Sequence, residues 1–399
     1  MTASPPRSIL PALSPEEQRH SRAVAALIHE QLAAAGGWLS FERFMELALY
    51  APGLGYYSAG SAKLGAAGDF VTAPEVSDLF SRCVARQCAA VLAVTGGDIL
   101  EVGAGTGRMA AALLGELAAQ GTLPGRYAIL EVSADLAARQ RTRLAQLPLG
   151  LRERVVWLER LPARPVRGVM LANEVADALP CRRFTWRAAG VTELGIVAAG
   201  EPAAQAPGFR ECGRPADATL AQQCAALQEG LPAPLPEGYT SEVCQRVAPW
   251  IASLGDCLER GLLLLCDYGL PRRHYYHPQR VSGTLRCHFR QRAHTDPYIN
   301  VGVQDITAWV DFTRVAEAAA AADLAVSGFA TQAAFLLALG IEQLVAAAPA
   351  GTRHARLAGE ARRLLMPEEM GEAFKAMALT RDLDPPLAGF TLQDLRHLL

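Results

Sequence analysis

Apolar runs alternate with helical patterns through the middle of this 399-residue chain. The runs near 98–102, 127–131, 154–158 and 168–172 predict strands, and helical spacing of apolar residues between them predicts intervening helices. Leu262 to Asp267 reads as a further central strand. Strands that are apolar at every position are typical of a sheet covered on both faces. The pattern therefore predicts an α/β fold with a mostly parallel sheet.

The flanking regions have a different pattern. Ser14, Pro15 and Glu17 predict a capped helix start, and this helix should run to about residue 35. Helical spacing predicts two more helices, over 41–50 and 76–95. Further along, 183–245 reads as short strands with one helix, and 314–378 reads as largely helical. Between the N-terminal helices, 51–75 combines glycines with aromatic residues, which favours a functional loop.

Composition narrows the class of protein. Half of the residues are hydrophobic and the net charge is −2, which excludes wholesale disorder and any global attraction to nucleic acid or membrane. We see neither a signal segment nor an uninterrupted apolar run of ~18 residues, so we expect a cytoplasmic protein without a membrane span. The nine cysteines form no CxxC pair, which predicts reduced thiols and no metal site.

A glycine-rich turn follows the strand near 98–102. The strand carries Glu101 near its end, and the turn contains Gly103, Gly105 and Gly107. Ligands of open α/β sheets lie at the carboxyl ends of strands, where glycine allows close backbone approach. A dinucleotide fingerprint would require a third glycine at position 108, which is Arg108. The turn therefore suits a nucleoside without a pyrophosphate, such as S-adenosyl-L-methionine (SAM). The alternative is an ordinary βαβ unit whose glycines serve only the turn.

The next strand supports the nucleoside interpretation. Glu131 ends the run Tyr127 to Leu130 and lies 24 residues after Gly107. A carboxylate at the tip of this strand can accept hydrogen bonds from both ribose hydroxyls, as the acidic residue about 20 residues on does in dinucleotide sites.

Further acidic residues follow the central strands. Glu174 and Asp177 are three residues apart, so on a helical turn they share one face and could clamp a guanidinium. A helix N-terminus capped by Asn173 explains the same residues equally well. Asp267 either faces the site or caps the turn that follows its strand. Glu242 is a weaker candidate on spacing alone.

Several ordered segments resemble one family, the MidA-like class I SAM-dependent methyltransferases. The matching segments are Phe44–Tyr50, Gly55–Tyr57, Gly68–Ser77, Glu101–Gly107, Asn173–Pro180, Asp267–Gly269 and Gly283–Phe312. Many relatives carry a proline and an arginine within the glycine turn, and many carry aromatic residues at the positions of Val175 and Ala176. The first departure should spare SAM binding, and the second changes the acceptor pocket.

The resemblance implies a Rossmann-like seven-stranded sheet with an N-terminal helical cover and an inserted α+β lobe. It implies that SAM is bound, and S-adenosyl-homocysteine released, by residues of the loop, the turn and two strand ends: Asp69, Phe70, Thr72, Glu75, Glu101, Gly103, Gly105, Gly107, Glu131 and Asn173. The acceptor would be an arginine of a protein, possible examples being respiratory-complex subunits, with Glu174 and Asp177 as catalytic carboxylates and Asp267 in support. The family includes a mitochondrial arginine methyltransferase that serves respiratory complex I assembly.

Two other functions stay open: methylation of a small molecule, and a non-catalytic assembly role in which SAM is bound. The oligomeric state is not predicted. We divide the chain into four segments: N-terminal helices and the loop at 1–97, the SAM-binding core at 98–270 with a strand-rich excursion at 183–245, a mostly helical inserted lobe at 271–385, and a return to the core at 386–399.

Overall fold

The computed structural model describes residues 10–59, 71–200, 208–384 and 387–399. The chain forms two compact units, and each is described by itself. Unit 1 comprises 1–70, 177–246 and 271–309, and unit 2 comprises 71–176, 247–270 and 310–399. These boundaries differ from the four predicted segments, because the excursion at 183–245 and the start of the predicted helical lobe fall into one unit.

Unit 2 contains the large sheet. Its strands are β2 (Asp98–Val102), β3 (Tyr127–Leu130), β4 (Val155–Leu158), β5 (Val166–Asn173), β10 (Leu258–Leu270), β14 (Val310–Asp311), β15 (Ala325–Thr331) and β16 (Phe374–Arg381). Seven of them follow the order β15-β16-β10-β5-β2-β3-β4, and β14 pairs with β10. All neighbours from β10 to β4 are parallel, whereas β16 runs antiparallel to both β10 and β15. The predicted α/β class with a large, mostly parallel sheet is confirmed, and the sheet has β14 in addition to seven strands along its main order.

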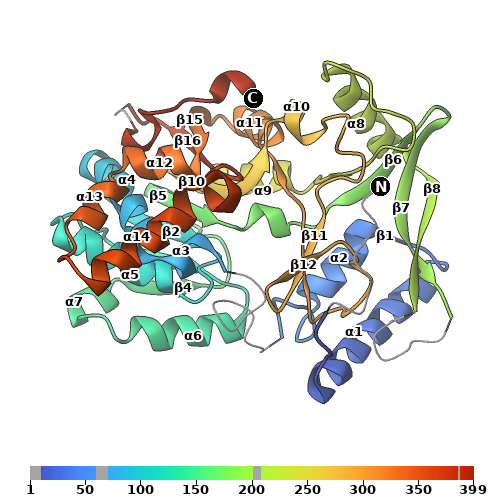
Figure 1. The fold of residues 1–399 in the computed structure, drawn as a ribbon, viewed down its shortest axis with the longest axis horizontal. Helices are drawn as coiled ribbons and strands as arrows, with labels where there is room; N and C mark the ends of the chain where they lie inside the picture. Colours follow the sequence, from blue (N-terminus) through green and yellow to red (C-terminus); the bar gives the residue numbers. More distant parts are fainter. Residues whose placement is uncertain (1–9, 60–70, 201–207, 385–386) are drawn as a thin grey trace. The chain divides into compact units, whose positions relative to one another are not determined.

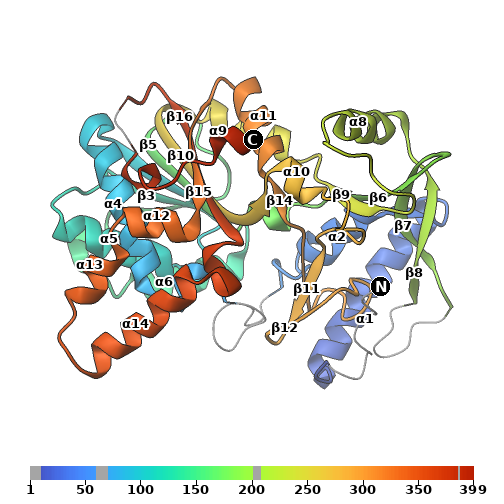
Figure 2. The same ribbon diagram turned by 45° about the horizontal axis from the view of Figure 1, so that its top comes forward.

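The helices of unit 2 lie along both faces of this sheet (Figure 1). They are α3 (Ala73–Val76), α4 (Asp78–Thr95), α5 (Arg108–Ala119), α6 (Ala134–Leu144), α7 (Leu149–Arg152), α9 (Val247–Asp256), α11 (Phe312–Ala321), α12 (Gln332–Ala338), α13 (Ile341–Ala346) and α14 (Thr352–Leu365). Helices α12, α13 and α14 pack near α4, as Figure 2 also shows, and α9 packs against α11.

Alternation along β10 explains the two layers. Leu262 and Leu264 join the core cluster that includes α4 and α5, whereas Leu263 and Leu265 are equally buried but are not part of that cluster. Successive side chains of a strand point to opposite faces, so a run of leucines covers both. Because both faces of this strand are buried, its central part is a continuous apolar run, and this run predicted the strand from the sequence.

The prediction that 314–378 is largely helical was incomplete, because β15 and β16 lie within that range. Strand β16 contains alanine, leucine, methionine and lysine, which helices also accept, and β15 contains two alanines. Their strand geometry is a property of the sheet, since β16 pairs with β10 on one side and β15 on the other. Tertiary pairing overrides local preference here.

Unit 1 is built around antiparallel strands. Its elements are α1 (Pro15–Ala34), β1 (Leu39–Ser40), α2 (Phe41–Tyr50), β6 (Arg182–Arg187), β7 (Gly190–Ala198), β8 (Phe209–Pro215), α8 (Ala218–Glu229), β9 (Thr240–Val243), α10 (Arg272–Tyr275), β11 (Arg286–Phe289), β12 (Arg292–His294) and β13 (Asp305–Thr307). The larger sheet has the order β1-β7-β6-β9, with β8 on β7, and the smaller one has the order β12-β11-β13. The predicted helix start is confirmed, since Ser14 and Glu17 form a reciprocal capping box.

Candidate functional site

The order of the strands marks where unit 2 holds a ligand. The chain passes from β2 outward through β3 to β4 and then places β5 on the opposite side of β2. Parallel sheets bind ligands at the carboxyl ends of strands where the order reverses in this way. The candidate site therefore lies at the carboxyl ends of β2 and β5. The glycine turn follows β2, and Glu174 follows β5.

The turn between β2 and α5 has the backbone that its glycines predict. Gly103, Gly105 and Gly107 all have positive φ, at +69°, +52° and +78°. Residues that carry a side chain rarely adopt this left-handed backbone conformation. A Cβ on Gly103 would also lie 3.2 Å from Cγ2 of Val175. The turn thus forms a narrow backbone cradle, in which the absence of Cβ atoms leaves room for a ligand.

Glu131 comes directly after β3, and both of its carboxylate oxygens are held. The Ser133 N–H donates to Oε1 at 2.8 Å, and the Gln140 side chain donates to Oε2 at 2.9 Å. Burial raises the pKa of Glu131, and these N–H donors offset part of that rise. The carboxylate has the orientation and the acceptor capacity that binding of a ribose requires.

Glu101 lies deeper than a ligand-contacting residue would. It is 2% exposed, and its Oε2 accepts the Tyr127 hydroxyl at 2.8 Å. Burial raises the pKa of this carboxyl to about 7. The side chain is placed to support the end of β2 from the protein interior, so its contact with a cofactor stays a prediction.

A short segment before α4 is fastened to the glycine turn. The Thr106 hydroxyl donates to Glu75, and the Arg108 guanidinium donates to the Glu75 carbonyl at 2.7 Å and to Asp78 at 2.9 Å. Thr72 is the N-cap residue of α3 in this segment. The predicted cofactor contacts Asp69 and Phe70 lie outside the described residues.

The end of β5 carries the predicted acceptor-side carboxylate. Glu174 Oε1 accepts the Ala73 backbone N–H at 3.0 Å and the Asn173 side-chain amide at 3.2 Å. The expected helical turn carrying both acids is wrong, because Glu174 has a φ of +52° and the short 3-10 helix begins only at Ala176. A left-handed non-glycine residue stores strain that the surrounding hydrogen bonds must hold.

Asp267 fixes the backbone that follows Glu174. Its carboxylate accepts the N–H groups of Val175 at 3.2 Å, Ala176 at 2.9 Å and Tyr268 at 2.9 Å. These hydrogen bonds support the interpretation of Asp267 as a residue that caps a turn, and its place in the ligand site stays a prediction. Asp177 belongs to unit 1, where it is buried and its carbonyl accepts the Ala308 N–H at 3.0 Å.

Sequence reasoning missed the residues that support this site. The Gln140 side chain contacts the Gly105 carbonyl as well as Glu131, and the Trp157 indole N–H donates to the side-chain oxygen Oε1 of Gln140 at 3.0 Å. A polar residue on the apolar face of a predicted helix was the signal available for Gln140, whereas Trp157 lay in a run that indicated only a strand.

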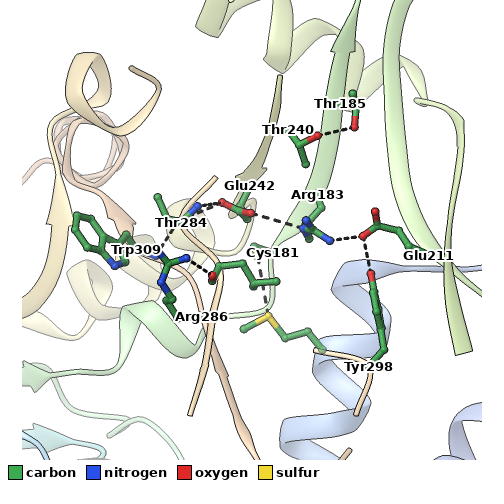
Figure 3. Close-up of polar contacts among 12 residues, drawn as sticks. Cys181, Arg183, Thr185, Glu211, Thr240, Glu242, Thr284, Arg286, Tyr298 and Trp309 are labelled. Atoms are coloured by element: carbon green, nitrogen blue, oxygen red, sulfur yellow. Dashed lines mark hydrogen bonds and ion pairs between the residues drawn. The ribbon is translucent and has the colours of Figure 1, made fainter. Parts of the chain in front are cut away.

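Unit 1 contains a second buried carboxylate, Glu242 of β9 (Figure 3). Its Oε2 accepts the Thr284 N–H at 2.8 Å, and its Oε1 lies 3.6 Å from Nε of Arg183. Arg183 extends from β6 toward Glu211 on its other side, and Glu211 also accepts the Tyr298 hydroxyl at 2.8 Å. The weak candidate Glu242 is therefore an ion-pair partner inside unit 1.

Two other kinds of feature are absent from the described residues. No cluster of three or more His, Cys, Asp or Glu side chains there could hold a metal ion. No helix in that part of the chain is long and apolar enough to cross a membrane.

Comparison with known proteins places these features in a family. The family model described as "putative S-adenosyl-L-methionine-dependent methyltransferase" matches residues 83–330. A Burkholderia thailandensis protein, solved with S-adenosyl-homocysteine bound, is 40% identical with a TM-score of 0.91, and the alignment covers 98% of this chain and all of that one.

Two curated relatives are more distant in sequence. The mitochondrial protein arginine methyltransferase NDUFAF7 of Danio rerio is 26% identical, and the alignment covers 90% of each chain. Its counterpart in Mus musculus is 28% identical over 86% of this chain and 81% of the mouse protein.

Proposed function

We propose, on the premise that this chain belongs to the family of putative S-adenosyl-L-methionine-dependent methyltransferases, that it methylates an arginine side chain of a protein. The family membership and the SAM cofactor are the premise. The acceptor is the proposal, and it draws support from the arginine methyltransferases that are 26% and 28% identical.

The residues of unit 2 fit the cofactor. The cradle of three glycines with positive φ accepts close backbone approach, and Glu131 lies oriented and half-buried at the next strand end. SAM supplies an electrophilic methyl group on a sulfonium and leaves as S-adenosyl-homocysteine. Glu131 would hold the ribose hydroxyls, and the turn would hold the rest of the nucleoside and the amino acid part.

The observation that carries the acceptor proposal is the placement of Glu174. Its carboxylate follows β5, the strand beside β2, and the Ala73 N–H and the Asn173 amide hold its orientation. An arginine side chain is cationic in water, so a carboxylate is needed to bind it and orient its nitrogen. Glu174 would then accept the proton that the nitrogen releases as its new bond to carbon forms.

Asp267 is a positioning residue in this scheme. By accepting the Val175 and Ala176 N–H groups, it fixes the strained turn on which Glu174 lies. Productive transfer requires the nitrogen to align with the carbon–sulfur bond, and a fixed turn lowers the entropy cost of that alignment. Asp177 stays a prediction as the second carboxylate.

The acceptor is tested by incubating the purified chain with methyl-labelled SAM and host lysate. We expect label in protein, and methylarginine after hydrolysis of the labelled species. Label in free small molecules would favour the small-molecule alternative, and no transfer alongside measurable S-adenosyl-homocysteine binding would favour a non-catalytic role. A respiratory-complex subunit as the acceptor and a cytoplasmic location stay predictions.

A further inference from the structure

We propose that Gln140 of α6 is a positioning residue for the nucleoside, because it joins Glu131 to the glycine turn in one fixed arrangement. This inference rests on the cofactor part of the proposed function. Gln140 is fully buried and is not among the residues that the sequence pointed to. Its role follows from three hydrogen bonds and from the packing of α6 against the turn.

The side-chain amide of Gln140 uses both kinds of hydrogen-bonding group. Its nitrogen donates to the Gly105 carbonyl and to Oε2 of Glu131, each at 2.9 Å. Its oxygen accepts the Trp157 indole N–H at 3.0 Å. An indole nitrogen can only donate, so Trp157 fixes which end of the amide faces the carboxylate. A flipped amide would set oxygen against oxygen at Glu131 and nitrogen against nitrogen at Trp157.

Packing leaves this amide little freedom to move. A Cβ on Gly107 would lie 3.3 Å from both Cα and Cγ of Gln140, so the glycine lets α6 approach the turn closely. One helical turn further, Arg143 donates to the Thr106 carbonyl at 3.1 Å. Residues three apart lie on one helix face, so α6 binds two successive carbonyls of the glycine turn.

The consequence concerns how Glu131 meets a ribose. With Ser133 holding Oε1 and Gln140 holding Oε2, the plane of the carboxylate is set before a ligand arrives. Each oxygen still has acceptor capacity, so the pair matches the two adjacent hydroxyls of a ribose. Both donors are neutral and favour the charged form, which offsets part of the rise in the pKa of Glu131 that burial causes. We infer that Gln140 makes the site selective for a nucleoside with a free 2′,3′-diol.

The test compares Gln140→Leu with Gln146→Leu, an identical change at an exposed residue shortly after the same helix. The probes are S-adenosyl-homocysteine and its 2′-deoxy analogue, measured by calorimetry. In Gln140→Leu we expect affinity for S-adenosyl-homocysteine to fall about tenfold to a hundredfold, as for a lost bond to a charged group. We expect the preference over the 2′-deoxy analogue to shrink too. Gln146→Leu should match the wild type in both.

The pH dependence of S-adenosyl-homocysteine binding distinguishes a positioning role of Gln140 from general damage to the fold. Hydrogen bonding by Gln140 lowers the pKa of Glu131 against the rise that burial causes. Without that bond the pKa rises further, so protonation should weaken binding at a higher pH in Gln140→Leu than in the wild type. A Gln140→Leu profile that parallels the wild type would contradict the inference.

If Gln140→Leu does not fold, Trp157→Phe keeps the test decisive. It retains an aromatic ring and removes only the donor that orients the amide, so we expect a smaller loss of affinity with the same loss of preference for the diol. Unchanged affinity and preference in both variants would overturn the role of Gln140 alone. A wild-type chain that does not bind S-adenosyl-homocysteine would overturn the proposed function as well.

Discussion

The two units hold acidic side chains in different ways. In unit 1, the buried Glu242 lies beside the guanidinium of Arg183, which in turn reaches Glu211. In unit 2, the half-buried Glu131 is held by neutral N–H groups of the backbone and of Gln140. A carboxylate paired with a cation has its charge neutralised within the protein. A carboxylate held by neutral donors has no such partner charge, so a ligand can interact with it.

Glu101 shows a third arrangement, in which the acid takes up a proton. One oxygen of the Glu101 carboxyl group accepts the Tyr127 hydroxyl, and burial raises the pKa of this group to about 7. Buried acidic residues thus occur in both units, and burial alone does not identify a site. The useful distinction is whether an acid is balanced by a cation, by a proton or by neutral donors, and whether it lies at a strand end of the parallel sheet.

The largest expected effect is on catalysis by unit 2. Glu174→Gln keeps the shape and removes the charge that would hold a cationic acceptor. Methyl transfer to the identified acceptor should fall roughly 10²–10⁴-fold, as for a lost acid–base group, while affinity for S-adenosyl-homocysteine changes little. Glu159→Gln, at an exposed position, serves as the matched control. Full activity in Glu174→Gln would remove this carboxylate from the mechanism and leave Asp177 as the remaining candidate.

The next effect should be on the stability of unit 1. Glu242→Ala removes one of the two carboxylates beside Arg183, which keeps Glu211, and it leaves the Thr284 N–H without its acceptor. A buried donor left without an acceptor costs about 1–3 kcal/mol of unfolding free energy. Urea unfolding measures this loss. Glu242→Gln keeps an acceptor for this N–H, so it should recover part of the loss. If Glu242→Ala instead weakened S-adenosyl-homocysteine binding without loss of stability, the contrast between the units would fail.

A third test concerns the protonated acid. Because the folded-state pKa of Glu101 is about 7 against an ordinary value of 4.5, the folded protein holds a proton that the unfolded chain releases. The unfolding free energy should therefore fall as pH rises from 4.5 to 7. Glu101→Gln should remove this loss and be more stable than the wild type at pH 8, by up to about 3 kcal/mol. Urea unfolding at pH 5 and pH 8 measures the difference, and equal differences at both pH values would contradict it.

The sequence was most informative where burial left a local pattern. Strands β2, β3, β5 and β10 each contain a short apolar run because helices cover both faces of the sheet, and the turn after β2 requires glycines that lie close together in the chain. Strands β15 and β16 escaped prediction because pairing decides their conformation: β16 pairs with β10, far away in the sequence, and β15 pairs with β16.

The residues of the site likewise divide into those that a local sequence pattern predicts and those that it does not. Glu131 and Glu174 follow predicted strands, so their positions at the sheet edge could be predicted. Gln140 and Trp157 could not, since their contact joins a helix to a strand 17 residues further on. The expected helical pairing of Glu174 with Asp177 failed because Glu174 has a left-handed backbone, and the turn after it is held by Asp267, which is far away in the sequence.

The smallest expected effect separates two roles of Ser133, namely capping a helix and orienting Glu131. Ser133 is the N-cap of α6, where its hydroxyl accepts the Leu136 N–H at 3.4 Å, while its own N–H donates to Glu131. Ser133→Ala removes only the cap, so the unfolding free energy should fall by about 0.5–1 kcal/mol and affinity for S-adenosyl-homocysteine should stay the same. Ser133→Pro removes the N–H that holds Glu131, so affinity should fall. Urea unfolding and calorimetry on the two variants check both outcomes. Weaker binding in Ser133→Ala than in Ser133→Pro would show that neutral backbone donors do not set the orientation of this carboxylate.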